Sequence, residues 1–197
     1  MYFANFTVIY DANVLYPNFL RDLLMRLAPR GLFRARWTED IHREWMESLL
    51  RDAVLRNHPT ITRERLERTR ALMDRHVLDA LVTGYESLIP GLILPDLDDR
   101  HVLAAAIKAQ AQLIITRNHK DFPPSALEPY GVKTQGPDDF VSDLWELDEQ
   151  TVLAAIEEQL RSFKNPRLTR DEYCQALERQ QLNRTAASLR NAWQLTA

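Results

Sequence analysis

Carboxylate and amide side chains gather at two places where an apolar segment begins or ends. Asp96, Asp98 and Asp99 precede an alanine-rich apolar segment, and Asn118 and Asp121 follow a short apolar run. Neighbouring carboxylates repel and raise one another's pKa, so a compensating cation is needed to keep them all ionised. Mg²⁺ and Mn²⁺ prefer such oxygen ligands. The cluster therefore indicates either plain solubility and helix capping, or a site that binds a divalent cation.

Two further acids stand close to predicted elements of secondary structure. Asp11 directly follows the β-branched and aromatic residues 6–10, which predict a buried strand. An Asp at a strand end is also a common turn residue. Glu44 lies about one and a half turns into the helix predicted after Thr38, a typical N-cap residue.

The elements that must position these acids alternate between strands and helices. We predict strands at residues 6–10, 32–37, 113–116 and 131–134, with a very short one at 93–94. We predict helices at residues 18–28, from 38, from 62, at 78–85, at 99–111 and from 137. This alternation favours an α/β fold, a three-layer domain with a mostly parallel central sheet. The carboxyl ends of its strands then share one edge, where ligands bind in open α/β sheets.

That edge is where the acids converge in this fold. Asp11, Asn118 and Asp121 follow strands, and Asp96 to Asp99 precede a helix whose N-terminus faces the same edge. Divalent ions held there can activate water and stabilise both the attacking and the leaving oxygen of a phosphoryl displacement. The residues alone thus predict a metal site suited to hydrolysis of phosphodiesters.

Four segments of the chain closely resemble the four signature blocks of PIN domains. They read VIYDAN at 8–13, TEDIHREW at 38–45, DDRHVLAAA at 98–106 and IITRNHKDF at 114–122. The resemblance covers roughly residues 5–140, in order and at suitable spacing. It implies a PIN-like fold and a metal-dependent ribonuclease. Many bacterial members are VapC-type toxins, so it also implies a cognate antitoxin, an RNA substrate and a homodimer.

The same resemblance implies roles for single residues, with Mg²⁺ or Mn²⁺ as the cofactor. Four acids take the metal-binding and catalytic positions: Asp11, Glu44, Asp99 and Asp121. Four neighbours support them: Thr116, Asn118, Asp96 and Asp98. The resemblance leaves open which acid of the Asp96–Asp99 segment binds the metal.

Each of these side chains also has a purely structural interpretation. Asp98 or Asp99 can cap the N-terminus of the following helix and interact with its dipole. Glu44 can pair with an arginine on its own helix, Asp121 can cap the following proline turn, and Asn118 can hold that turn through an Asx bond.

The charge is unevenly distributed along the chain. Residues 76–160 carry 15 acids and 5 bases, a net charge of −10, although the whole chain has only −3. The flanking segments are rich in arginine, which binds phosphate and carboxylate groups bidentately. Arg43, Arg100 and Arg117 adjoin the acidic segments and are candidate RNA-binding residues, while a solvated helix surface is the competing interpretation.

The composition changes after residue 146. We predict a PIN-like nuclease domain at residues 1–146 and a helical C-terminal extension at 147–197, with helices at about 150–163 and 169–190. Such an extension resembles that of a longer PIN subgroup. Its arginine surplus suits RNA or an acidic partner peptide.

The single cysteine, Cys174, excludes a disulfide within the chain and suits a reducing compartment. The N-terminus lacks the features of a signal peptide, and no apolar run approaches the roughly 18 residues of a membrane span. We therefore expect a cytoplasmic protein without membrane contact. Cys174 itself is expected to be a small buried residue.

Other functions remain as alternatives to a ribonuclease. Five histidines invite a zinc interpretation, but none has the usual ligand spacing, which favours surface or supporting positions. A structure-specific DNA nuclease and a catalytically silent PIN-fold binding module also fit the acids. A receiver-like signalling module fits poorly, because Asp11 has no acidic neighbour.

Overall fold

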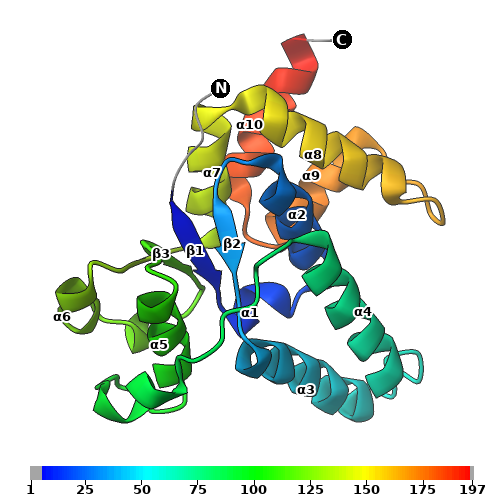
Figure 1. Ribbon diagram of the computed structural model, residues 1–197. Coiled ribbons are helices and arrows are strands. Elements are labelled where there is room, and N and C mark those ends of the chain that lie inside the picture. The colour runs from blue at the N-terminus through cyan, green and yellow to red at the C-terminus, as the bar shows by residue number, and fades with distance from the viewer. Residues whose placement is uncertain (1–5, 196–197) are drawn as a thin grey trace.

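The central feature of the fold is a parallel sheet. The structure is a computed structural model that describes residues 6–195. Within this range, four parallel strands form one sheet in the order β2-β1-β3-β4 (Figure 1). They are β1 (Thr7–Tyr10), β2 (Arg34–Arg36), β3 (Leu113–Ile115) and β4 (Lys133–Gln135). The predicted α/β class with a mostly parallel sheet is confirmed.

Helices follow the strands along the chain. The α-helices of the described residues are α1 (Ala12–Leu15), α2 (Asn18–Leu27), α3 (Glu39–Leu55), α4 (Arg63–His76), α5 (Arg100–Lys108), α6 (Pro124–Leu127), α7 (Pro137–Leu147), α8 (Glu149–Ser162), α9 (Arg170–Arg179) and α10 (Asn183–Leu195). Short 3₁₀ turns are η1 (Ala28–Arg30), η2 (Glu86–Gly91), η3 (His119–Asp121) and η4 (Glu128–Tyr130). In the described part of the chain, no helix combines the length and apolarity that crossing a membrane requires.

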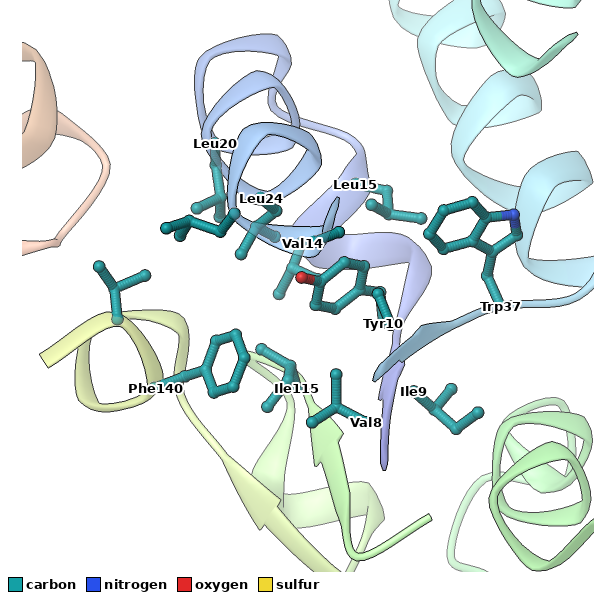
Figure 2. Close-up of a cluster of buried hydrophobic side chains, with 14 of the residues drawn as sticks. Val8, Ile9, Tyr10, Val14, Leu15, Leu20, Leu24, Trp37, Ile115 and Phe140 are labelled. Carbon is teal, nitrogen blue, oxygen red and sulfur yellow. The ribbon is translucent and has the colours of Figure 1, made fainter. Parts of the chain in front are cut away.

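Strand β1 lies at the centre of the core and is buried on both faces. Val8, Ile9 and Tyr10 are all inaccessible to solvent. Figure 2 shows the Tyr10 ring on the side of the strand that faces Val14 of α1 and Phe140 of α7, while Ile9 points to the opposite side. A strand that is covered on both faces needs a continuous apolar run, which is what the sequence supplies there.

Helix α5 packs closely on the sheet because its inner residues are small. Ala104, Ala105 and Ala106 are fully buried, and the helix contacts β1 and β3. This packing places the start of α5, and with it Asp99, at the edge where the strands end. At that edge the backbone N–H of Asp11 donates to the carbonyl of Ile115 at 3.1 Å, which joins the ends of β1 and β3.

The segment at 78–85 is not a helix, contrary to the prediction. Its apolar residues have helical spacing, but the backbone instead pairs with the end of β2. Trp37 donates to the carbonyl of Ala80 at 3.0 Å and accepts from the N–H of Val82 at 2.8 Å. Pairing at an exposed sheet edge satisfies these backbone groups, and sequence spacing does not reveal it. The strand predicted at 93–94 is likewise irregular backbone.

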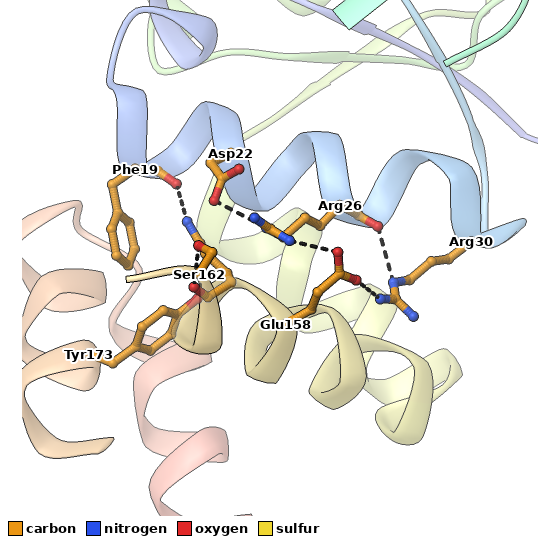
Figure 3. Close-up of polar contacts among 8 residues, drawn as sticks. Phe19, Asp22, Arg26, Arg30, Glu158, Ser162 and Tyr173 are labelled. Atoms are coloured by element: carbon orange, nitrogen blue, oxygen red, sulfur yellow. Dashed lines mark hydrogen bonds and ion pairs between the residues drawn. The ribbon is translucent and has the colours of Figure 1, made fainter. Parts of the chain in front are cut away.

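The C-terminal helices pack against α2 and α7: α8 contacts both, and α10 contacts α7 and α9 (Figure 1). The helix predicted at 169–190 is two helices, because the chain turns between α9 and α10, where Gln181 has a φ of 59°. Polar contacts join these helices to the first part of the chain: Glu158 of α8 pairs with Arg26 and Arg30, both at 2.7 Å (Figure 3). The boundary at 146/147 stays a prediction.

A buried polar network fixes the start of α3, the helix that carries Glu44. His42 is fully buried, and its Nδ1 accepts from the indole N–H of Trp45 at 3.0 Å. Its Nε2 must then be the protonated nitrogen, and it donates to Oδ1 of Asp74 at 2.9 Å. The indole N–H of Trp37 donates to the same oxygen at 2.8 Å. One carboxylate of α4 therefore orients α3 and the end of β2.

We expect Asp74→Ala to lower the free energy of unfolding by about 3 kcal/mol, because it leaves two buried donors without an acceptor. Glu67→Ala, on the same helix but in an exposed ion pair with Arg70, should change it by less than about 1 kcal/mol. Urea unfolding of both variants tests this. Equal losses in the two variants would contradict the role given to the network.

Candidate metal centre

A cleft of about 450 Å³ opens at the carboxyl edge of the sheet. Its lining comes from four separate parts of the chain: the segment around α1, one side of α3, the segment at Asp99 and the segment at Asn118. The residues that line it are Asp11, Ala12, Asn13, Tyr16, Glu44, Trp45, Glu47, Ser48, Arg51, Asp99 and Asn118. Three of the four predicted catalytic acids thus face one cleft.

Asp11 is the most buried of these acids, with only 4% of its surface exposed. Its Oδ2 accepts hydrogen bonds from the hydroxyl of Thr116, at 2.6 Å, and from the side-chain amide of Asn13. Burial raises the pKa of Asp11, the Thr116 hydrogen bond lowers it, and the charge of Glu44 raises it again; the net direction is upward. The fold therefore fixes this carboxylate in one orientation and keeps water largely away from it.

Asn13 is a site residue that we did not single out from the sequence. Besides Asp11, its amide donates to Thr116 Oγ1 at 2.8 Å, and its Oδ1 accepts the backbone N–H of Arg117 at 3.0 Å. Thr116 Oγ1 also accepts the backbone N–H of Asn118 at 3.0 Å. The only sequence signal is the position of Asn13 two residues after Asp11, within the segment VIYDAN.

Asp99 occupies the N-cap position of α5 but does not act as a cap. Within residues 6–195 its side chain makes no capping hydrogen bond, and its Oδ2 is buried without a hydrogen-bond partner. Burial raises its pKa to about 7, helped by the charges of Asp11, Asp96, Asp121 and Glu44. Capping does not account for this residue, and a cation would satisfy it.

Asp96, Asp99 and Asp121 form one group of carboxylates, whose oxygens can all lie within 4.8 Å of one another. Asp98 lies outside this group and is exposed. Its backbone N–H donates to Asp96 Oδ1 at 2.9 Å. The geometry favours Asp99 over Asp98 as the ligand of this segment.

Glu44 and Asp121 each have one hydrogen-bonded neighbour. Glu44 Oε1 lies 2.7 Å from Nε2 of His101, which is 7% exposed. Burial lowers the pKa of His101, but the hydrogen bond and charge of Glu44 outweigh it, and the net shift is upward. Asp121 Oδ2 accepts from the amide of Asn118. His101 thus supports the site by orienting Glu44.

Two other histidines make separate contacts. His42 is buried against Asp74, and His119 Nδ1 lies 3.1 Å from the hydroxyl of Thr134. Among residues 6–195, the only cluster of possible metal ligands consists of the three aspartates at positions 96, 99 and 121. Cys174 is buried in α9. The arrangement favours oxygen ligands rather than a zinc site.

The three candidate RNA-binding arginines have different surroundings. Arg43 is mostly exposed and pairs with Asp40 at 2.6 Å. Arg100 donates from Nε to the carbonyl of Leu97 at 2.9 Å. Arg117 points to the C-terminal helices and donates to the carbonyl of Gln180 at 2.8 Å. Arg51, which was not singled out, lines the cleft itself.

The residues present fit a divalent cation. Several carboxylates converge, an oxygen of Asp99 lacks a partner, and the pKa values of Asp11 and Asp99 are both raised. These are the consequences of gathering acids at one place without a positive charge between them. A hard cation with oxygen ligands would relieve the repulsion.

We expect Asp99→Asn to stabilise the metal-free protein and to remove the stabilisation by Mn²⁺. At pH 8, after allowance for solvent screening, removing one like charge should raise the Tm by about 2–4 °C without metal. Asp98→Asn is the control and should respond to Mn²⁺ like the wild type. Thermal unfolding with and without MnCl₂ tests this, and a wild-type response of Asp99→Asn to Mn²⁺ would exclude Asp99 as a ligand.

The raised pKa of Asp99 also predicts how metal binding depends on pH. Its folded pKa of about 7 lies above the ordinary value of 3.8, so the folded metal-free protein binds the proton more tightly. The free energy of unfolding should then fall as pH rises between these values. Mn²⁺ must displace this proton, so its affinity should drop about tenfold per pH unit below 7. Calorimetric titration at pH 6, 7 and 8 measures it; a flat profile would contradict the shift.

Comparisons with known proteins agree with this arrangement. The family model of the PIN domain matches residues 7–120, and the model described as the VapC50 C-terminal domain matches residues 137–191. One relative, named "Putative ribonuclease VapC50", from Mycobacterium tuberculosis, is 39% identical over 101 residues. That match covers 51% of this chain and 59% of the relative's length. No solved structure matches the chain.

The PIN-domain match contains the segments of Asp11, Glu44 and Asp99 and most of the sheet, and it ends at residue 120, one residue before Asp121. The C-terminal match begins at residue 137 and therefore includes α7, which we had assigned to the nuclease domain. Fold, clustered acids and sequence similarity lead to one conclusion: this chain belongs to the PIN-domain family and carries a VapC50-type C-terminal region.

Proposed function

We propose that this protein is a Mg²⁺- or Mn²⁺-dependent endoribonuclease, the toxin of a bacterial type II toxin–antitoxin pair. The observation that carries the proposal is the cluster of carboxylates around Asp99, which has an unpartnered oxygen and a raised pKa. A structural acidic cluster would instead have its charges paired. The name of the relative, a ribonuclease, supports RNA as the substrate.

Asp11, Asp99, Glu44 and Asp121 would hold the metal, with Asp96 as a further ligand. A bound divalent ion supplies a Lewis acid that activates water and stabilises charge on the phosphate. The neighbours fix the ligands in place: Thr116 and Asn13 orient Asp11, His101 orients Glu44, and Asn118 orients Asp121. Such supporting contacts typically change metal affinity or activity 10- to 100-fold.

The shape of the cleft supports a nucleic-acid substrate. From the acids it extends along α3 to Ser48 and Arg51, and Tyr16 at the end of α1 also lines it. Arg51 donates to Ser48 Oγ at 2.9 Å and has no carboxylate partner among the ion pairs of the described residues. A cation at this position can contact a phosphate next to the one that is cleaved. Arg43 lies on the same helix as Arg51, and Arg100 follows Asp99 at the start of α5; both are candidates to extend this contact.

The proposed partners follow from the family. A VapC-type toxin is paired with an antitoxin, and a homodimer is expected by the same kinship. A cytoplasmic location is proposed from the single cysteine, which is buried and free. Co-expression with the neighbouring gene product, and light scattering of the purified protein, test the partner and the dimer.

We expect the purified wild type to cleave total RNA with Mn²⁺ and not with EDTA. Asp11→Asn should slow cleavage at least about 100-fold, because a metal site supplies several kcal/mol of transition-state stabilisation. Asp98→Asn is the matched control and should keep most activity.

Three outcomes would contradict the proposal. Unchanged cleavage by Asp11→Asn would remove this residue from the site. Equal or faster cleavage of matched DNA would favour the structure-specific DNA nuclease. Binding of Mn²⁺ and RNA without cleavage would favour a catalytically silent PIN-fold module.

A further inference from the structure

Arg117 connects the candidate metal site to the C-terminal helices. It lies between Thr116 and Asn118, in the loop that follows β3. Its guanidinium leaves the site and donates from Nη2 to the backbone carbonyl of Gln180, at 2.8 Å, in the turn between α9 and α10. The same nitrogen lies 3.5 Å from Oε1 of the Gln180 side chain.

The backbone of Arg117 makes a contact in the opposite direction. Its N–H donates to Oδ1 of Asn13 at 3.0 Å. The amide of Asn13 in turn donates to Oδ2 of Asp11 and, at 2.8 Å, to Thr116 Oγ1. Only one side chain therefore separates the backbone of Arg117 from the most buried acid of the site. A displacement of Arg117 would reach Asp11 through Asn13.

The surroundings of Arg117 do not suit an ordinary ion pair. It is partly buried, and burial lowers its pKa. Among the described residues, Arg117 forms no salt bridge with a carboxylate, and its Nε is buried without a hydrogen-bond partner. Asp138 and Asp139 line the small cavity of about 200 Å³ beside it. However, Asp139 pairs with Arg184 at 2.6 Å, and Asp138 accepts from the start of α10.

The acceptor of this hydrogen bond is held firmly in place. The N–H of Gln180 donates to the carbonyl of Leu177 at 2.9 Å, and that of Leu182 donates to the same carbonyl at 2.9 Å. Asp138 of α7 caps α10 by accepting from the N–H groups of Arg184 and Thr185, at 2.9 and 3.0 Å. The turn is thus a fixed point to which a loop of the nuclease domain can be attached.

We propose that Arg117 is a positioning residue through which the α9–α10 turn orders the loop at 116–121 and the carboxylate of Asp11. The C-terminal region then helps to fix the geometry of the metal site, in addition to any role in binding partners. Burying a guanidinium with only a carbonyl acceptor is unfavourable by itself, which is expected where the geometry of a site is being fixed. The effect on catalysis rests on the proposed nuclease function and the effect on Mn²⁺ binding rests on its metal site, whereas the effect on hydrogen exchange rests on neither.

The competing role is the one suggested by sequence, a direct contact of Arg117 with RNA. The two roles differ in what they change. A phosphate contact affects KM and its dependence on salt, and leaves Mn²⁺ binding without RNA unchanged. A positioning residue affects Mn²⁺ affinity and kcat, and leaves KM for RNA nearly unchanged.

The experiment compares full-length wild type, Arg117→Met, Arg117→Lys and Arg184→Ala. Methionine keeps an apolar stem of similar length and removes the donors, whereas lysine restores one donor for the carbonyl of Gln180. Arg184→Ala is the matched control, because Arg184 also joins the C-terminal helices to α7 but does not contact the loop at 116–121. For each protein we would measure Mn²⁺ affinity by calorimetry, hydrogen exchange of the peptides covering residues 11–16 and 116–121, and kcat and KM for RNA.

We expect Arg117→Met to weaken Mn²⁺ binding about 10-fold or more and to speed hydrogen exchange in both peptides. Its kcat should fall by a similar factor with KM within about twofold of wild type. Arg117→Lys should recover most of the Mn²⁺ affinity. Arg184→Ala should lower the Tm while leaving Mn²⁺ affinity and the exchange of both peptides unchanged.

The inference is wrong if Arg117→Met binds Mn²⁺ like the wild type, or if it raises KM alone. It is also wrong if Arg184→Ala weakens Mn²⁺ binding as much, since general loosening would then explain both. Should Arg117→Met fail to fold, the comparison of Arg117→Lys with Arg184→Ala decides in the same way. If the wild type binds Mn²⁺ but cleaves no RNA, the proposed function is wrong. Mn²⁺ affinity and hydrogen exchange of the variants still test the positioning role of Arg117 in that case.

Discussion

The repulsion between carboxylates at one edge of the sheet is the constraint on which the rest of the site depends. Asp11, Asp99 and their acidic neighbours are brought together where solvent is partly excluded, so each makes ionisation of the others less favourable. The raised pKa of Asp99 and its unpartnered Oδ2 are consequences of this repulsion. A cation that relieves this repulsion would be bound more tightly, because the fold has already brought the carboxylates together.

Contacts with residues outside the cluster hold each acid in this unfavourable arrangement. The pairing of the parallel strands β1 and β3 fixes the positions of Asp11 and Thr116, which directly follow them. The small residues of α5 let Asp99 approach these two residues. The buried network of His42 and Asp74 fixes α3, from which Glu44 reaches His101. Stability built into these distant contacts offsets the local cost of the site, as is usual where geometry serves function.

The sheet and the main acids were predictable from the sequence because each depends on short-range pattern. An apolar run predicts a buried strand, and the parallel topology then assigns its following residue to the ligand-binding edge. The roles of Asn13, His101 and Arg117 depend on which side chains meet across long stretches of sequence, and local spacing carries no such information. The segment at 78–85 shows the same limit, because pairing with Trp37 overrides its helical spacing.

The position of a bound metal tests the account most directly. Crystals soaked in MnCl₂ above pH 7 would be examined for anomalous scattering from manganese. We expect an anomalous manganese peak within coordination distance, about 2.0–2.3 Å, of carboxylate oxygens of Asp99 and Asp11. Strong manganese peaks elsewhere with none between these two residues, at an occupancy-saturating concentration, would contradict it.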